Sequence, residues 1–113
     1  MNLLFICNQG KNRSRTAAEL FRGSFGTDSA GLYCPSPVTS RQLAWADVII
    51  VMEDRHRTEI ARRFPQIYLH KQILVLDIPD VYRHGQAELV QLLSARMTEL
   101  LQPFLHLPYH PTP

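Results

Sequence analysis

The amino-acid sequence predicts an α/β fold, a three-layer sandwich in which helices cover both faces of a four-stranded parallel sheet. Short runs of consecutive apolar residues alternate with segments in which apolar residues recur at helical spacing. Strands buried on both faces have continuous apolar runs, and their alternation with helices is typical of parallel sheets. With 113 residues, 45% of them hydrophobic and 19% charged, the chain has the size and composition of an ordinary globular domain.

Four segments have the composition of strands. They span residues 3–6, 27–32, 47–52 and 73–76. The third is the clearest, because it is apolar almost throughout and is followed at once by helical spacing. The segment after the last strand, residues 77–82, is predicted to be a loop, since Pro79 interrupts any regular element.

Segments with helical spacing lie between and after these strands. They span residues 14–25, 39–46, 53–64 and 87–104. Ser14 is the expected N-cap of the first helix, because a serine hydroxyl accepts a hydrogen bond from a free N–H group of the first turn. The third helix is expected to stop before Pro65, and the last carries one long apolar stripe.

One domain is predicted over residues 1–105, and the proline-rich residues 106–113 are predicted to form a frayed tail. The N-terminal apolar run has no basic flank and is too short for a signal peptide or a membrane span. A cytoplasmic protein without a membrane partner is therefore expected.

Composition also argues against several classes of function. The net charge of +2 is a mild excess without the dense basic stripe of nucleic-acid binders, so no nucleic-acid partner is expected. The five histidines, His56 among them, lack the spacing of a metal site and are assigned to the surface. No metal or other cofactor is implied. Two cysteines, Cys7 and Cys34, are too few for a disulfide framework.

The predicted chemistry lies between the first strand and the first helix. Cys7 ends the strand, and Arg13 follows six positions later where the helix starts. The N–H groups of such a loop converge, and a helix N-terminus adds about half a positive charge, so the loop suits a tetrahedral dianion. The residues predicted to bind phosphate are Asn8, Gln9, Gly10, Lys11, Asn12, Arg13 and Ser14.

Three residues of this loop have different predicted roles in phosphate chemistry. The Arg13 guanidinium can hold two phosphate oxygens with its planar fork. The same positive field favours the thiolate of Cys7, which is the predicted nucleophile, and Ser14 can add a hydrogen bond to its sulfur. Cys34, beside Pro35, is predicted to be structural instead.

A general acid is expected to protonate the oxygen that leaves phosphorus. The loop after the fourth strand offers two carboxyl groups, Asp77 and Asp80, at the same edge of the sheet as Cys7. The residues alone leave the choice between them open. Tyr33 and Tyr82 are candidates for a substrate cleft, or equally for the core or its rim.

The sequence resembles the low-molecular-weight protein tyrosine phosphatases at four landmarks in the same order. These are the Cys7 loop with Arg13, Ser14 and residues 16–18, the segment 28–31, the segment 46–52 and the segment 77–82. The resemblance implies a phosphocysteine mechanism with Cys7, Arg13 and Asp80 as catalytic residues, since Asp80 falls on the family's Asp-Pro-Tyr position. It also implies that Ser29 supports the loop by a hydrogen bond. The implied substrate is a phosphorylated protein or a small aryl phosphate.

The chain departs from the family's pattern inside the loop. Gln9 and Gly10 stand where the family usually has glycine and then asparagine, and Asn12 stands where a second cysteine is frequent. The segment between Gly31 and Asp47 is also shorter than in the family. Two alternatives stay open beside phosphatase activity: arsenate reduction on the same fold, and a phosphate-sensing or phosphopeptide-binding module with little turnover.

Overall fold

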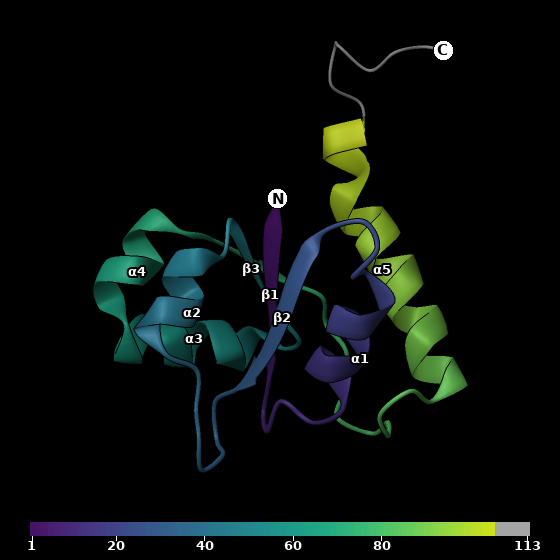
Figure 1. Cartoon of the computed structure of the whole chain (residues 1–113), viewed down its shortest axis with the longest axis horizontal. Helices are drawn as coiled ribbons and strands as arrows, with labels where there is room; N and C mark the ends of the chain where they lie inside the picture. The colour runs from purple at the N-terminus through teal and green to yellow at the C-terminus, as the bar shows by residue number, and fades with distance from the viewer. Residues whose placement is uncertain (106–113) are drawn as a thin grey trace.

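The strands of the protein form one parallel sheet in the order β2-β1-β3-β4 (Figure 1). The structure, a computed structural model, describes the backbone of residues 1–105 and the side chains of residues 1–100; the predicted tail, 106–113, lies outside the described residues. The elements are β1 (Asn2–Cys7), α1 (Arg13–Leu20), β2 (Gly26–Gly31), α2 (Ser40–Trp45), β3 (Val48–Val51), α3 (Asp54–Arg63), α4 (Pro65–His70), β4 (Gln72–Val75) and α5 (Ala87–Leu105). The predicted four-stranded parallel sheet is confirmed.

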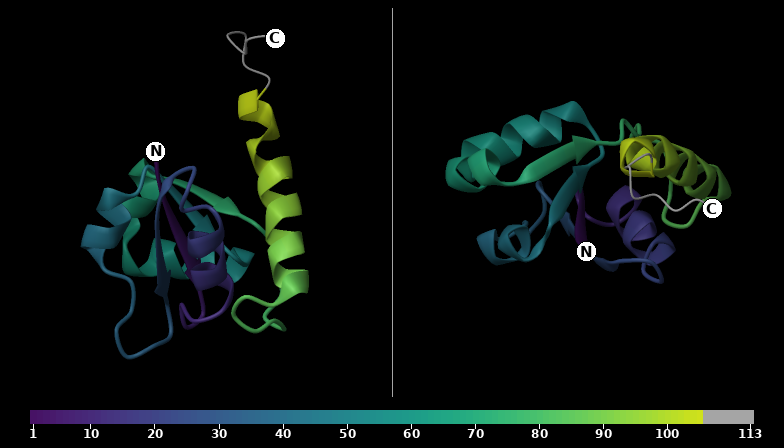
Figure 2. Two further views of the ribbon diagram at one scale, coloured as in Figure 1. Left: turned by 45° about the vertical axis from the view of Figure 1, so that its right-hand side comes forward. Right: turned by 90° about the horizontal axis from the view of Figure 1, so that it is seen from above.

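Alternate side chains of the central strands pack on opposite faces of the sheet. Leu3 and Phe5 of β1 join the core beneath α1 and α5, as does Ile50 of β3. Leu4 and Ile49 belong to the second core, which lies on the other face. Figure 2 shows α1 and α5 on one face and α2, α3 and α4 on the other. Both faces are covered, which explains why these strands are continuous apolar runs.

The carboxyl ends of the four strands meet at one edge of the sheet, at the bottom of Figure 1. The loops that follow β1, β3 and β4 therefore come together there, although they are far apart in the sequence. β1 is central, with β2 on one side and β3 on the other, so the residue that ends β1 is surrounded by these loops.

Helix α4 is missing from the sequence prediction. The prediction ended the preceding helix before Pro65, and α3 does end at Arg63, but the proline then starts a second helix, Pro65–His70. Proline suits the first position of a helix because its missing N–H group would have no partner there. The residue that stops one helix thus starts the next.

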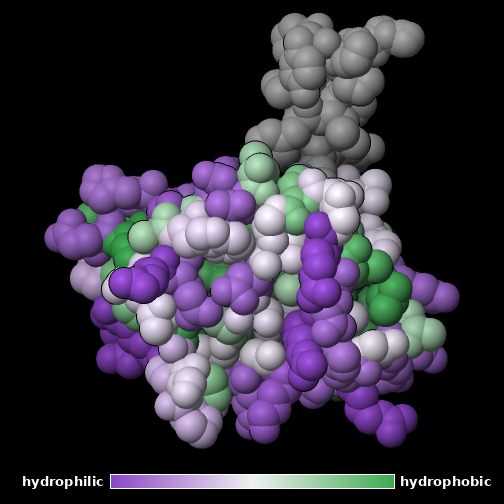
Figure 3. Space-filling view, viewed as in Figure 1, coloured by the Kyte–Doolittle hydropathy of each residue, from purple (hydrophilic) through white to green (hydrophobic). Residues whose placement is uncertain are grey.

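Most of the surface seen in Figure 3 is hydrophilic, and its apolar residues form separate small groups. α5 has 19 residues and packs its buried side chains Leu89, Leu93 and Met97 toward the sheet. Of the helices in the described part of the chain, none is long and apolar enough to cross a membrane.

The start of α2 is closed by a capping box. The Thr39 hydroxyl accepts a hydrogen bond from the Gln42 N–H at 3.2 Å, and the Gln42 side-chain oxygen accepts one from the Thr39 N–H at 3.1 Å. We predict that Thr39→Ala lowers the free energy of unfolding by about 1 kcal/mol, measured by urea denaturation. Ser40→Ala removes the neighbouring exposed hydroxyl and is the control. Equal losses in the two variants would contradict a role for the cap.

Candidate active site

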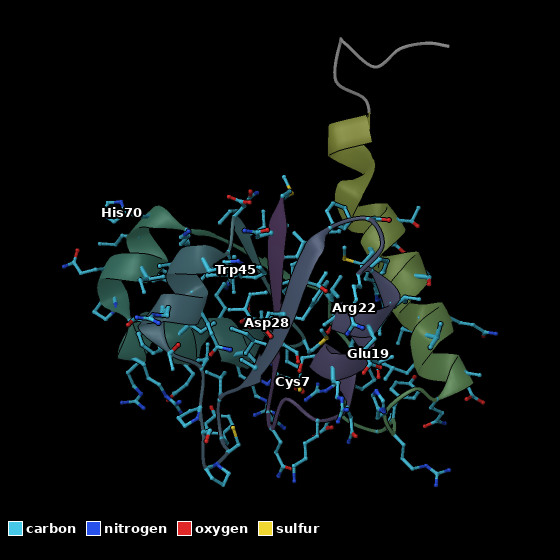
Figure 4. All side chains as sticks on the ribbon, in the orientation of Figure 1. Cys7, Glu19, Arg22, Asp28, Trp45 and His70 are labelled. Carbon is cyan, nitrogen blue, oxygen red and sulfur yellow. The ribbon has the colours of Figure 1, made fainter. Side chains whose placement is uncertain are left out.

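Cys7 is the last residue of β1, and Figure 4 shows it at the edge where the strands end. Its side chain is only 3% exposed. The Sγ atom accepts a hydrogen bond from the Gly10 N–H at 3.2 Å and lies 3.1 Å from the Ser14 Oγ. Two hydrogen-bonding groups thus meet the sulfur, and both stabilise negative charge when they donate to it.

The expectation that Ser14 caps α1 is wrong. The helix begins one residue earlier, at Arg13, and Asn12 occupies the N-cap position without a side-chain cap. Ser14 is therefore buried in the first turn, where its Oγ lies between Cys7 Sγ and the carbonyl oxygen of Ala30, 3.4 Å away.

Gly10 gives the loop its shape. Its φ of +72° is in the left-handed region, which glycine adopts without strain. A Cβ atom on Gly10 would lie 2.8 Å from the backbone nitrogen of Gly31, and one on Gly31 would lie 2.5 Å from the backbone carbon of Gln9. The loop and the end of β2 thus pack backbone against backbone. The Leu32 and Tyr33 N–H groups add hydrogen bonds to the Asn8 carbonyl oxygen at 2.9 and 2.7 Å.

Arg13 is the most deeply buried charged residue of the site, with 1% of its side chain exposed. One nitrogen, Nη1, donates to the Glu53 carboxylate at 2.5 Å and to the Ile78 carbonyl oxygen at 2.7 Å. The other two, Nε and Nη2, have no hydrogen-bond partner within the described residues. The guanidinium is thus held from the β3 and β4 sides, and two donors stay available.

Of the two candidate acids, the structure brings only Asp80 to the loop. Asp80 Oδ1 lies 3.6 Å from Arg13 Nε, and Oδ2 accepts a hydrogen bond from the Asn8 side-chain amide at 3.0 Å. Asp77 has a φ of +62° and lines a different cavity, beside Arg96 of α5. The geometry therefore favours Asp80, in agreement with the family resemblance.

A cavity of about 170 Å³ opens beside the sulfur. It is lined by Cys7, Asn8, Gln9, Lys11, Asn12, Arg13 and Asp80. The two remaining residues of the predicted phosphate loop, Gly10 and Ser14, lie behind it and contact the Cys7 sulfur. In the part of the chain that the structure describes, no three His, Cys, Asp or Glu side chains are grouped to hold a metal ion.

Sequence reasoning missed two residues of the site, Glu53 and His56. The surface assignment of His56 is wrong, because its side chain is fully buried. His56 Nδ1 accepts a hydrogen bond from the Glu53 N–H at 3.0 Å, and Nε2 lies 2.8 Å from the Asn8 Oδ1. One signal was available: Glu53 follows the clearest strand directly, where polar residues reach the shared edge. Nothing comparable marks His56, which reaches the loop from the first turn of α3.

Both of these groups have displaced pKa values. Hydrogen bonds from Arg55 and then Arg13 lower the pKa of Glu53 to about 2, against the opposing effect of burial. Burial lowers the pKa of His56 to about 4, and the positive charges of Arg13 and Arg55 add to the effect. Glu53 is therefore an anion and His56 a neutral imidazole near pH 7.

The loop that carries Asp80 is fastened to the rest of the site by main-chain hydrogen bonds. The Ile78 N–H donates to the Met52 carbonyl oxygen at 2.8 Å. Farther along, the His84 N–H donates to Asn12 Oδ1 at 3.2 Å and the Gly85 N–H to Thr16 Oγ1 at 3.0 Å. β3 and the start of α1 thus fix the two ends of the segment around Asp80.

Three other predicted residues do not line the cavity. Ser29 is predicted to support the loop, but its hydroxyl makes no hydrogen bond within the described residues. Its backbone N–H donates to Asp28 Oδ1 at 2.8 Å. The end of β2 supports the loop through its backbone instead. Tyr33 is exposed beneath the Arg63 guanidinium, 5.3 Å from the ring centroid, and Tyr82 packs on the core below α1 and α5.

No protein-family profile matches the sequence, and no curated protein is similar to it in sequence. Solved structures match its fold. The YwlE arginine phosphatase from Geobacillus stearothermophilus aligns at 20% identity and a TM-score of 0.67, over 92% of this chain and 94% of its own. The tyrosine phosphatase Wzb from Escherichia coli K30, solved with phosphate, aligns at 21% and 0.75, over 90% and 96%. The low-molecular-weight protein tyrosine phosphatase from T. tengcongensis aligns at 15% and 0.71, over 91% and 99%.

The chain has the low-molecular-weight protein tyrosine phosphatase fold. The fold implied by the four sequence landmarks is therefore confirmed. The alignments cover almost the full length of the matching chains, so the short segment between Gly31 and Asp47 leaves the fold intact.

We predict that Gly10→Ala abolishes binding of inorganic phosphate, measured by isothermal titration calorimetry. The new Cβ would meet the backbone of Ala30 and Gly31 at less than 3 Å, so the loop has to move. Gly85→Ala is a matched control, because Gly85 also has a positive φ, +75°, but no atom within 4 Å of the added Cβ. That variant should lose about 1 kcal/mol of stability and keep phosphate binding. Phosphate binding by Gly10→Ala at wild-type affinity would contradict the contact.

A second prediction concerns His56 and pH. The unfolded chain takes up a proton on this residue below about pH 6.5, whereas the folded protein does so only near pH 4. The free energy of unfolding should therefore fall as the pH falls through this window, by at most about 3 kcal/mol. Urea denaturation of His56→Gln should show a weaker loss of stability. His70 is exposed, so His70→Gln should follow wild type. Equal slopes in all three proteins would contradict a buried neutral imidazole.

Proposed function

We propose that this chain is a phosphomonoesterase of the protein tyrosine phosphatase type that acts through a phosphocysteine intermediate. The proposal rests on the unpaired hydrogen-bond donors of Arg13. Its buried guanidinium lines the cavity beside Cys7, and its Nε and Nη2 have no hydrogen-bond partner in the described residues. Buried donors without partners are costly, and those of a guanidinium match two oxygens of a phosphoryl group. The site is therefore suited to an oxyanion held next to a thiolate.

In the first step, the Cys7 thiolate attacks phosphorus. The S–P bond forms while the bond between phosphorus and the ester oxygen breaks, and Asp80 gives that oxygen its proton. The alcohol or phenol thus leaves as a neutral molecule. Arg13 and the N–H groups of the loop hold the remaining phosphoryl oxygens, where charge must be stabilised in the transition state.

In the second step, water attacks the phosphorus of the phosphocysteine. The S–P bond breaks, the Asp80 carboxylate takes the proton of the water, and inorganic phosphate leaves. Cys7 is again a thiolate and Asp80 is again protonated, so the cycle closes. Asp80 is about half exposed at the rim of the cavity, where both a leaving group and a water molecule have access to it.

The proposed substrate is a phosphorylated protein or a small aryl phosphate. The solved structures with this fold include proteins named as tyrosine phosphatases and as an arginine phosphatase, so the fold by itself leaves the phosphorylated group open. The cavity around Cys7 is lined by polar side chains and suits the phosphoryl group itself. The organic part of the ester then lies outside it, on the side of the half-exposed Asp80. A cytoplasmic location and the lack of nucleic-acid or membrane partners stay predictions from the sequence.

Arsenate reduction and phosphate sensing would use the same loop, so the experiments must distinguish them from phosphatase activity. A thiol-coupled reductase needs further cysteines near the nucleophile. Cys34 does not line the cavity, and its thiol donates to the Ser36 carbonyl oxygen at 3.4 Å. A sensing module would bind phosphate at the Arg13 donors without turnover.

The proposal predicts the activity of three variants on p-nitrophenyl phosphate. Cys7→Ser should remove turnover, because the nucleophile is lost. Asp80→Asn should lower kcat/KM by about 10²-fold or more, the usual contribution of a general acid. Asp77→Asn should keep wild-type activity, and it is a sound control because asparagine tolerates the left-handed backbone of that position.

Hydrolysis that survives Cys7→Ser would rule out the phosphocysteine mechanism. Loss of activity in Asp77→Asn, with activity kept in Asp80→Asn, would assign the acid to the other aspartate. Phosphate binding by a wild-type protein that hydrolyses nothing would favour the sensing module, and consumption of arsenate with thiol oxidation would favour the reductase.

A further inference from the structure

A chain of hydrogen bonds runs from the backbone of the α3 N-cap to the proposed acid. It passes from the Glu53 N–H through His56 and Asn8 to Asp80, with distances of 3.0, 2.8 and 3.0 Å. We propose that Asn8 and His56 are positioning residues that orient Asp80 and determine which of its oxygens carries the catalytic proton. The inference rests on the proposed function, because it assigns Asp80 a proton to deliver.

The direction of the chain is fixed at its first link. A backbone N–H group can only donate, so His56 Nδ1 must be the acceptor and carries no proton. In a neutral imidazole the proton then sits on Nε2. His56 Nε2 is therefore the donor in its hydrogen bond to Asn8 Oδ1. The lowered pKa of His56 is consistent with this neutral form.

The second link fixes the orientation of the Asn8 amide. An amide has one acceptor end and one donor end, so Oδ1 toward His56 places Nδ2 toward Asp80. A flipped amide would set N–H against N–H at His56 and oxygen against oxygen at Asp80. The contact at His56 would be repulsive in either protonation state of Asp80, and the contact at Asp80 would be repulsive with its carboxylate. The flip is therefore disfavoured.

The third link distinguishes the two oxygens of Asp80. Oδ2 accepts from Asn8 Nδ2, so it acts as the carbonyl-type oxygen of the protonated acid. The proton is then left to Oδ1, which faces Arg13 Nε at 3.6 Å and so lies on the side of the phosphate cavity. After the proton has gone to the leaving group, the same Oδ1 can take the proton of the attacking water.

The hydrogen bonds also connect an exposed side chain on a loop, Asp80, to two residues that the fold holds in place, His56 and Asn8. Asp80 is half exposed on a loop, and an exposed side chain must lose rotamer freedom before it can act at one point. His56 is fully buried, and the Asn8 carbonyl oxygen is held by two N–H groups from beyond β2. Asn8 therefore transfers the fixed position of the loop and of α3 to the acid.

The test uses two substrates that differ in their need for an acid. Phenyl phosphate has a poor leaving group and p-nitrophenyl phosphate a good one, so loss of acid catalysis affects the first more. Asn8→Ala should lower kcat/KM about tenfold on phenyl phosphate and much less on p-nitrophenyl phosphate, since positioning is part of the acid's total effect of about 10²- to 10⁴-fold. Inhibition by inorganic phosphate should be unchanged, because the variant keeps the Arg13 donors and the backbone N–H groups of the loop, and the Asn8 side-chain amide is occupied by His56 and Asp80.

His56 is tested with a conservative pair of variants. His56→Gln keeps a side-chain N–H near the position of Nε2 and should retain more activity on phenyl phosphate than His56→Ala, with both folded states checked by circular dichroism. His84→Gln is the matched control: His84 is also on the Asp80 loop, but its ring bonds to Glu19 at 2.7 Å and not to the chain. It should show the wild-type ratio of the two substrates.

A double-mutant cycle decides whether Asn8 acts through Asp80. In the Asp80→Asn background, Asn8→Ala should cause no further loss on phenyl phosphate. A full additional loss there, or an equal loss on both substrates in the single variant, would overturn the inference while leaving the proposed phosphatase activity in place. A wild-type protein that hydrolyses neither substrate would instead overturn the proposed function, and the assignment of a proton to Asp80 with it.

Discussion

A permanently charged guanidinium, buried at the edge of the sheet, is the constraint around which the site is organised. Arg13 is 1% exposed, and a charge removed from water must be repaid by hydrogen bonds and by an opposite charge. Two separate parts of the chain accept hydrogen bonds from the same nitrogen, Nη1. They are the Glu53 carboxylate, after β3, and the Ile78 carbonyl oxygen, after β4. The same contacts that stabilise the arginine therefore bring together the loops that form the cavity.

The remaining donors of Arg13 link stability to function. If all of its N–H groups had protein partners, the residue would be satisfied without a ligand. Nε and Nη2 lack such partners in the described residues, and Arg13 lines the cavity together with Cys7 and Asp80. Glu53 has an additional ion pair with Arg55, so the carboxylate that holds Arg13 is itself held. The positive charge is thereby kept in place whether or not an anion is bound.

Local patterns determined much of what the sequence could predict. The strands, the Cys7 loop and the loop of the two aspartates follow from apolar runs, turn-forming residues and the common edge of parallel strands. Contacts between segments that are distant in the sequence could not be predicted from these local patterns. His56 has the sequence surroundings of an exposed helix, and only the approach of α3 to Asn8 buries it. Ser14 resembles an N-cap by composition, but the helix starts at Arg13 and Asn12 takes the N-cap position.

The backbone of the loop accommodates both of its departures from the family that it resembles. The family's asparagine position is Gly10 here, and the backbone at this point has a left-handed φ that glycine adopts freely and asparagine tolerates better than most residues. The family's glycine position is Gln9, which is exposed and lines the cavity. The close packing of the loop is between backbones, where Gln9 and Gly10 face Ala30 and Gly31. The backbone path of the loop is therefore compatible with the two residues that this chain carries there, Gln9 and Gly10.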